Sequence, residues 1–304
     1  MIVRAPSFAA AAVLLAATAA LAQTDPPPAK ITVTKLQTLT LGLTGYTGED
    51  AARSDAEVIQ ATLSAKLGRN VTTRVFPNSD ALSSALAKGE IDLAWMQPFA
   101  VVDASKKGKV TPLVKAVRHG LPFYRGVLFT KGEKTVPILK GATSLRVAWV
   151  SKTSAAGYLF PRAFLVQGGL KPAKLFKSET FEGDHGAVCR AVLAGKAEVG
   201  ATYADDVTSG APQVDGCVQA VGAEAAKDLH IIATSAPIPN DAIVLRPGLD
   251  PAEAERVRKT FVGLAEDTTG KALLASVFKA EGFVEAGADD FEPVKFAAEA
   301  SAKK

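Results

Sequence analysis

The stretch ALAKGEIDLAW, residues 85–95, reads as the end of a helix, a glycine stop, one acidic residue and a buried strand. Glycine at position 89 is typical of the position just after a helix, and the apolar run that follows is typical of a strand. The stretch AVLAGKAEVGA, residues 191–201, aligns with it without gaps, 106 residues further along the chain. In both, an acid follows the glycine by three positions, as Asp92 or Glu198. This internal echo suggests two lobes built on one plan.

The neighbouring segments alternate between strand and helix patterns. Residues 31–43 and 71–76 are β-rich, and the helical spacing of 52–67 ends at Gly68. Strands that alternate with helices predict an α/β fold in which mostly parallel sheets are covered by helices on both faces. Ligands of such sheets bind beyond the carboxyl ends of strands, so residues 96–98 and 203–206 are candidate edges of a site.

The N-terminus has the pattern of an export signal. Arg4 precedes an apolar run over 8–21, and Ala20-Leu21-Ala22 presents the small residues that signal peptidase requires. We expect a signal peptide over 1–22, cleavage after Ala22 and a periplasmic location, with residues 23–30 as a Pro-rich linker. A buried helix or a retained membrane anchor is the alternative, although the run is shorter than the ~20 residues of a spanning helix.

Length and composition narrow the function classes. The exported chain of about 280 residues suits two lobes. Its formal net charge of +4 is spread without a basic cluster, so no nucleic-acid partner is expected. Motifs for a serine nucleophile, a P-loop or a dinucleotide are missing, and His119, His185 and His230 lack metal-ligand spacing. We therefore expect no catalytic site, metal or cofactor.

Two cysteines, Cys189 and Cys217, follow the export signal. An oxidising compartment favours a disulfide between them, which would close a loop of 29 residues. Two separate small core residues are the alternative, because sequence does not show the Cα separation that a disulfide requires.

Four segments together resemble the periplasmic binding proteins of phosphonate, phosphite and phosphate ABC transporters. They are LAKGEIDLAWMQPFA (86–100), TSAAGYLFPRAFL (153–165), GDHGAVCRAVLAGKAEVGATYAD (183–205) and APIPNDAIVLRPGL (236–249). The resemblance implies a two-lobed type II periplasmic binding fold with a two-strand hinge near 128–131 and 232–237. Lobe 1 would comprise residues 31–128 plus 237–304, and lobe 2 residues 129–236.

The resemblance also implies a ligand site. In the family, a run of hydroxyl residues before a helix grips the phosphonate oxygens, and here that run falls on residues of which only the first two keep a hydroxyl. His185, Asp205 and Asp241 match family binding positions, while Ser79 and Met96 replace two ligand-facing tyrosines for which Tyr46 or Tyr124 would substitute. The expected ligand-binding residues are thus Thr153, Ser154, Ala155, Ala156, His185, Asp205, Asp241, Met96, Ser79 and Tyr46.

These observations predict an exported, monomeric solute-binding protein that captures a small phosphonate-like or amine-bearing ligand for an ABC permease. The alternatives are a sensor subunit that presents its solute to a membrane histidine kinase, and an enzyme on the same fold. Each hydroxyl missing at Ala155 and Ala156 removes a charge-assisted hydrogen bond of roughly 1.5–3 kcal/mol. Simple phosphonates should therefore bind weakly, and hydroxyls restored at these positions should strengthen their binding.

Overall fold

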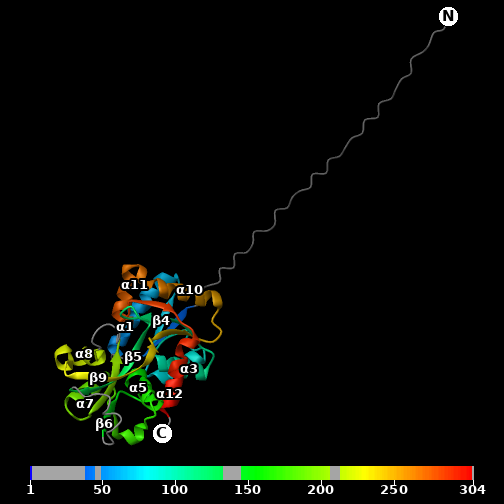
Figure 1. Cartoon of the computed structure of the whole chain (residues 1–304). Helices are drawn as coiled ribbons and strands as arrows, with labels where there is room; N and C mark the ends of the chain where they lie inside the picture. Colours follow the sequence, from blue (N-terminus) through cyan, green and yellow to red (C-terminus); the bar gives the residue numbers. More distant parts are fainter. Residues whose placement is uncertain (2–37, 45–48, 133–144, 206–212, 303–304) are drawn as a thin grey trace. The chain divides into compact units, whose positions relative to one another are not determined.

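The computed structural model describes Met1 and residues 38–44, 49–132, 145–205 and 213–302. Residue contacts divide the chain into residues 1–36 and a compact unit of residues 37–304. All elements described below belong to this second unit (Figure 1). Tyr46 and residues 1–37, apart from Met1, lie outside the described residues, so the predicted signal peptide and linker stay predictions.

Within the described residues, the strands form two sheets, in the orders β11-β4-β10-β3-β1-β2 and β7-β6-β8-β5-β9. The first sheet contains β1 (Leu39–Thr44), β2 (Val71–Phe76), β3 (Leu93–Met96), β4 (Thr111–Val117), β10 (Ala242–Leu245) and β11 (Gly282–Glu285). The second contains β5 (Phe123–Lys131), β6 (Leu145–Trp149), β7 (Phe176–Phe181), β8 (Val199–Ala204) and β9 (Leu229–Pro239).

The helices occur between the strands and at the C-terminus. Those before β9 are α1 (Glu49–Leu67), α2 (Ser79–Ala87), α3 (Pro98–Lys107), the π-helical turn η1 (Ala155–Leu159), α5 (Phe160–Gln167), α6 (Pro172–Leu175), α7 (His185–Leu193), α8 (Asp215–Val221) and α9 (Ala223–Ala226). Those after β10 are α10 (Pro251–Val262), η2 (Gly263–Glu266), α11 (Thr268–Leu273), η3 (Leu274–Phe278), η4 (Ala288–Phe291) and α12 (Glu292–Ser301).

The internal echo is a structural repeat. The helices α2 and α7 span 79–87 and 185–193, an offset of 106 residues at both ends. Their N-caps keep the same offset: the side chain of Asn78 accepts the N–H of Ala81, and that of Asp184 accepts the N–H of Ala187. Strand pairing follows it too, since β1 pairs with β3 in the same register as β6 with β8.

The acid in each copy of the repeat joins two parallel strands. Asp92 accepts the backbone N–H of Thr40 at the start of β1, at 2.9 Å, and the guanidinium of Arg246 at 2.8 Å. Glu198 accepts the backbone N–H of Arg146 at the start of β6, at 2.7 Å, and also pairs with the Arg146 side chain. The acidic residue after the glycine therefore sets the register of the strand pair in each sheet.

The two sheets are mixed rather than mostly parallel. In each, three consecutive strands are parallel, β2-β1-β3 or β7-β6-β8, and the next strand runs antiparallel to them. That antiparallel strand is β10 in the first sheet, reached directly from β9, and β5 in the second, reached directly from β4. The chain thus passes between the sheets at 118–122 and at 240–241, whereas the predicted hinge positions lie inside β5 and β9.

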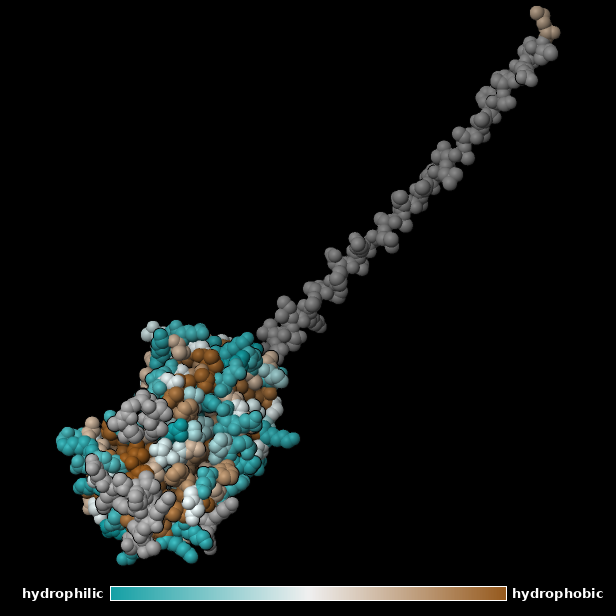
Figure 2. All heavy atoms as spheres, in the orientation of Figure 1, coloured by the Kyte–Doolittle hydropathy of each residue, from teal (hydrophilic) through white to brown (hydrophobic). Residues whose placement is uncertain are grey.

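The C-terminal helix α12 packs against α5 and α3 (Figure 1), so it contacts helices associated with both sheets. One apolar cluster contains Phe76 and Met96 of the first sheet together with Ala156 and Phe160 beside the second. Hydrophilic and hydrophobic side chains are interspersed on the visible face of the molecule (Figure 2). Within the described residues, no helix combines the length and the apolar character that a membrane crossing requires.

Candidate ligand-binding site

The repeat places Ser79 and His185 at equivalent positions, as the first residues of α2 and α7. The first N–H groups of a helix have no partner within the helix, and the helix dipole makes this end electropositive. Each half of the fold therefore presents a helix start beyond the carboxyl ends of its parallel strands, where ligands of open α/β sheets bind.

The first helix start opens onto a pocket of about 330 Å³, which we call the α2–α3 pocket. It is lined by Asn78, Ser79, Asp80, Gln97, Phe99, Ala100, Asp103 and Thr153. The start of α3 also faces it, since Gln97 is the N-cap of α3 and makes no side-chain capping bond. The carboxylates of Asp80 and Asp103 are held by the ammonium of Lys107, at 2.5 and 2.7 Å, which offsets part of their charge.

The predicted oxyanion loop contributes to this pocket through Thr153 alone. Ser154 instead caps η1, because its hydroxyl accepts the N–H of Gly157 at 3.0 Å. The side chains of Ala155 and Ala156 are 7% and 2% exposed and belong to the apolar cluster described above. Alanine at these two positions therefore serves packing, and the sequence comparison with a hydroxyl-lined loop did not show this.

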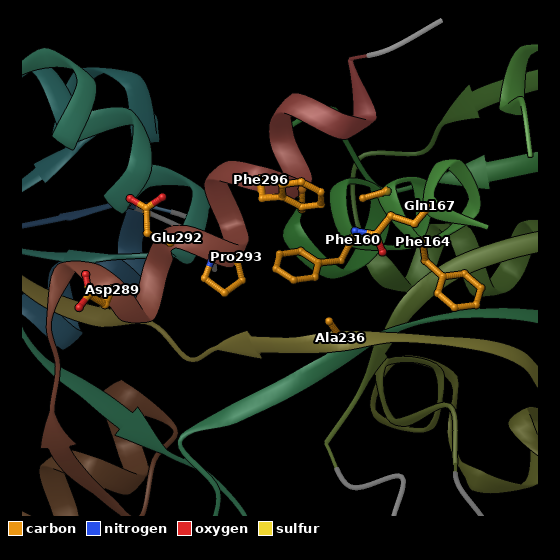
Figure 3. A pocket seen from close by; sticks show the side chains of 10 residues that line it. Phe160, Phe164, Gln167, Ala236, Asp289, Glu292, Pro293 and Phe296 are labelled. Carbon is orange, nitrogen blue, oxygen red and sulfur yellow. The ribbon is translucent and has the colours of Figure 1, made fainter. Parts of the chain in front are cut away.

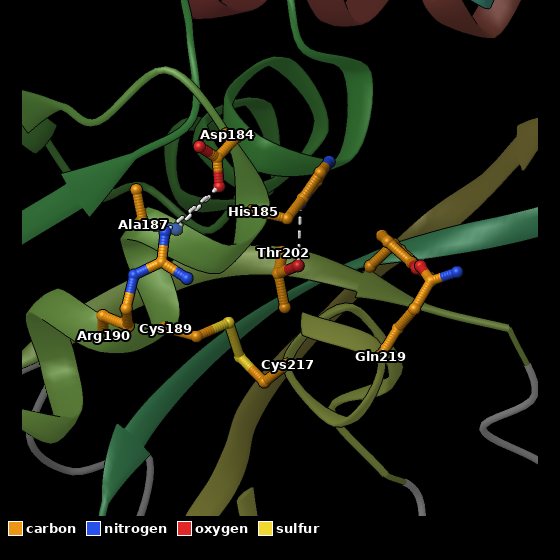
Figure 4. The surroundings of a disulfide bond; sticks show 9 residues. Asp184, His185, Ala187, Cys189, Arg190, Thr202, Cys217 and Gln219 are labelled. Atoms are coloured by element: carbon orange, nitrogen blue, oxygen red, sulfur yellow. Dashed lines mark hydrogen bonds and ion pairs between the residues drawn. A yellow bond between two sulfur atoms is a disulfide. The ribbon is translucent and has the colours of Figure 1, made fainter. Parts of the chain in front are cut away.

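His185 lies at the second helix start, where its Nδ1 is 2.7 Å from the hydroxyl of Thr202 (Figure 4). Burial lowers the pKa of His185 to about 4, so the imidazole is neutral near pH 7. Its ring meets the ring of Tyr203 edge to face, and Tyr203 meets Tyr124 in the same way. Burial raises the pKa of both tyrosines, that of Tyr203 to about 12, so both hydroxyls keep their protons.

The two predicted ligand carboxylates both have basic partners. Asp241 accepts Nη2 of Arg118 at 2.8 Å. Asp205 lies 3.4 Å from Nε2 of His119, and burial raises the pKa of this carboxyl. Sequence reasoning missed Arg118 and His119 as partners, and no motif marks them: they are known only from the turn that carries the chain between the sheets.

A second pocket, of about 180 Å³, lies beside Arg118 and Asp241. Gln97 lines it as well as the α2–α3 pocket, so the two pockets share this residue. The other lining residues are Leu43, Thr44, Asp55, Trp95, Val277, Phe278 and Lys279. Met96, by contrast, is completely buried in the apolar cluster, so the structure places this predicted contact in the core.

The predicted disulfide is confirmed: Cys189 of α7 and Cys217 of α8 are bonded and both are completely buried (Figure 4). The bond joins the helix that begins at His185 to the helix that packs beside the end of β8.

A third pocket, of about 480 Å³, lies between α5 and α12 and contains none of the predicted site residues (Figure 3). Its walls include Phe160, Phe164 and Phe296, with Asp289 and Glu292 at one end. Phe164 and Phe296 are 39% and 54% exposed.

Comparison with known proteins agrees with this architecture. A family model described as "ABC transporter, phosphonate, periplasmic substrate-binding protein" matches residues 41–291. The phosphate-import protein PhnD of Mycolicibacterium smegmatis is 30% identical over 125 residues, which cover 38% of this chain and 39% of that protein.

Solved structures show the same fold at low sequence identity. A Xanthomonas citri protein bound to a chloride ion has a TM-score of 0.70 at 20% identity, covering 87% of this chain and 97% of that chain. PhnD1 from Prochlorococcus marinus, in complex with methylphosphonate, has a TM-score of 0.67 at 19% identity, covering 86% of this chain and 97% of that chain. These likenesses confirm the two-lobed type II periplasmic binding fold.

The chain belongs to the family of periplasmic substrate-binding proteins of phosphonate ABC transporters. This family consists of solute-binding transport proteins rather than enzymes, and the comparisons favour transport over the sensor-subunit alternative.

Proposed function

We propose that this protein captures a small tetrahedral oxyanion of the phosphonate class in the α2–α3 pocket and delivers it to an ABC permease. The observation that carries the proposal is the composition of that pocket. Two helix starts beside the first sheet, at Ser79 and Gln97, share it with Thr153, which follows β6 of the second sheet. An anion bound there would contact both halves of the fold.

The physical basis is the unpartnered N–H groups at the two helix starts. Each helix dipole is equivalent to roughly half a positive charge at this end, and N–H groups directed at one point bind phosphate-like oxygens. The pocket volume of about 330 Å³ lies at the small end of the range for ligand pockets, roughly 300–1,000 Å³. A small oxyanion fits this volume better than a drug-sized molecule.

The names of similar proteins support the same ligand class. One imports phosphate, and one was solved with methylphosphonate. We propose that this chain is likewise exported, with its signal peptide removed after Ala22, and that it acts as a monomer with the permease as its partner. A monomer is consistent with a site whose lining residues all come from one chain.

The experiment is calorimetric titration of the purified exported chain with methylphosphonate, phosphite and phosphate, with acetate as the comparison anion. The test variant is Thr153→Glu, which places a negative charge on an exposed side chain of the pocket. We expect at least one of the three oxyanions to bind, and Thr153→Glu to weaken it more than tenfold. The matched control is Thr269→Glu, an equally exposed position in α11.

Two results would contradict the proposal. If none of the three oxyanions binds to the wild type, the ligand class is wrong. If both glutamate variants bind like the wild type, the site lies elsewhere.

A further inference from the structure

The two carboxylates that the family resemblance assigns to the ligand are both paired by one dipeptide, Arg118-His119. Asp205 follows β8, and Asp241 lies in the crossing between β9 and β10. They come from distant parts of the chain, yet the guanidinium of Arg118 contacts Asp241 at 2.8 Å and the imidazole of His119 contacts Asp205 at 3.4 Å.

Further contacts hold Arg118 in place. Its Nε donates to the carbonyl of Lys279 at 2.9 Å, and its Nη2 donates to the carbonyl of Phe278 at 3.2 Å. Only 23% of its side chain is exposed, and its partner Asp241 is 21% exposed. Because the backbone of another segment orients the guanidinium, the ion pair does not depend on a bound ligand.

The turn that carries the dipeptide is equally constrained. Arg118 and Leu121 exchange two backbone hydrogen bonds of 2.9 Å, and the N–H of Gly120 donates to Glu281 at 2.9 Å. Asn240, which is 1% exposed, donates from its Nδ2 to the carbonyl of Leu121 at 3.0 Å. His119 has a φ of 50°, a left-handed conformation that costs a non-glycine residue roughly 1–2 kcal/mol. The surrounding hydrogen bonds maintain this conformation and thereby direct both side chains at the carboxylates.

We propose that Arg118-His119 is the specificity determinant of the cleft: it neutralises both carboxylates from within the protein, so that the cleft selects oxyanions without an amine. The inference rests on the proposed function. An unpaired, partly buried carboxylate would attract a ligand ammonium, whereas a carboxylate already paired with a guanidinium offers little net charge. The same guanidinium lines the pocket of about 180 Å³ beside Gln97, where it would repel a ligand ammonium.

The test compares two ligands with the same phosphonate head: ethylphosphonate, and aminoethylphosphonate, which carries an ammonium. Calorimetry at pH 7.5 gives the affinity ratio of the two for the wild type and for three variants. Arg118→Met removes the guanidinium and keeps an apolar stem of similar length. His119→Asn removes the imidazole from a side chain that is 66% exposed, and asparagine tolerates the left-handed conformation. The matched control, Arg258→Met, removes a guanidinium from its surface pairs with Glu255 and Glu285.

We expect the wild type to bind ethylphosphonate more tightly. Arg118→Met should shift the ratio toward aminoethylphosphonate by at least tenfold, His119→Asn should shift it in the same direction by a smaller factor, and Arg258→Met should leave it unchanged. If Arg118→Met does not fold, His119→Asn still decides the outcome. The inference is overturned if the wild type prefers the amine, or if the ratio stays constant while both ligands bind. Failure of both ligands, and of phosphite and phosphate, to bind to the wild type overturns the proposed function as well.

Discussion

Removing the disulfide should weaken ligand binding as well as lower stability, because the bond fixes α8 beside the candidate site. Cys217 lies in α8, and Cys189 lies in α7. Asp215, two residues before Cys217, accepts the backbone N–H of Asp205 at 2.9 Å. The position of the Asp205 backbone therefore depends on a helix that the disulfide holds in place.

The same helix supports two further site residues. Gln219 accepts the hydroxyl of Tyr203. Gly216 packs so closely on Thr202 that a Cβ at the glycine would lie 2.1 Å from the threonine hydroxyl oxygen. Thr202 in turn holds the ring of His185. Loss of the bond to α7 should loosen all of these contacts together.

The perturbation is the double variant Cys189→Ala/Cys217→Ala, which avoids placing a polar group at two completely buried positions. With a sequence separation of 28 between the cysteines, the chain-entropy model assigns the bond roughly 3.5 kcal/mol of stability. For a protein of this size, 1 kcal/mol lowers Tm by roughly 2–4 °C, so the expected decrease is about 7–14 °C. We expect methylphosphonate affinity to fall roughly tenfold, which corresponds to ~1.4 kcal/mol spent on re-ordering α8 when the ligand binds.

Differential scanning calorimetry measures Tm, and isothermal titration at 15 °C, where both proteins stay folded, measures affinity. Leu264→Ala serves as the matched control, because Leu264 is completely buried in the core around the first sheet and its truncation costs a similar ~2–5 kcal/mol. The reasoning is refuted if the disulfide variant keeps wild-type affinity, or if Leu264→Ala loses as much affinity as the disulfide variant does.

Two further predictions concern the second helix start and the loop after β6. Stability against urea should decrease as the pH falls from 6.5 toward about 4, because the unfolded His185 takes up a proton that the buried ring does not. His185→Gln should remove that part of the slope, at most ~3 kcal/mol, and an unchanged difference between wild type and variant across this pH range would contradict the assignment. The double variant Ala155→Thr/Ala156→Ser should lose ~1–3 kcal/mol of stability without gaining methylphosphonate affinity, because both side chains are buried among apolar neighbours. This outcome is opposite to the one expected from the sequence, and a gain in affinity in calorimetry would restore the sequence-based interpretation.

The two-lobed plan could be predicted from the sequence because its signals are local. A helix that ends at glycine, an acid three residues later and an apolar strand form one short segment, and its two copies at residues 85–95 and 191–201 have the same structure. The pairing of Cys189 with Cys217 was predictable for a related reason, since an exported chain with two cysteines allows one intramolecular pair.

The chemistry of the cleft depends on contacts between distant segments, and only the tertiary structure decided it. Arg118 and Asp241 are separated by 123 residues, and nothing near either one in the sequence indicates their ion pair. Ala155 and Ala156 read as lost hydroxyls in a loop, yet they fill a core that α2, α3 and α12 complete. A family motif records which residue types occupy a loop, whereas the direction of each side chain depends on what packs against it from the rest of the chain.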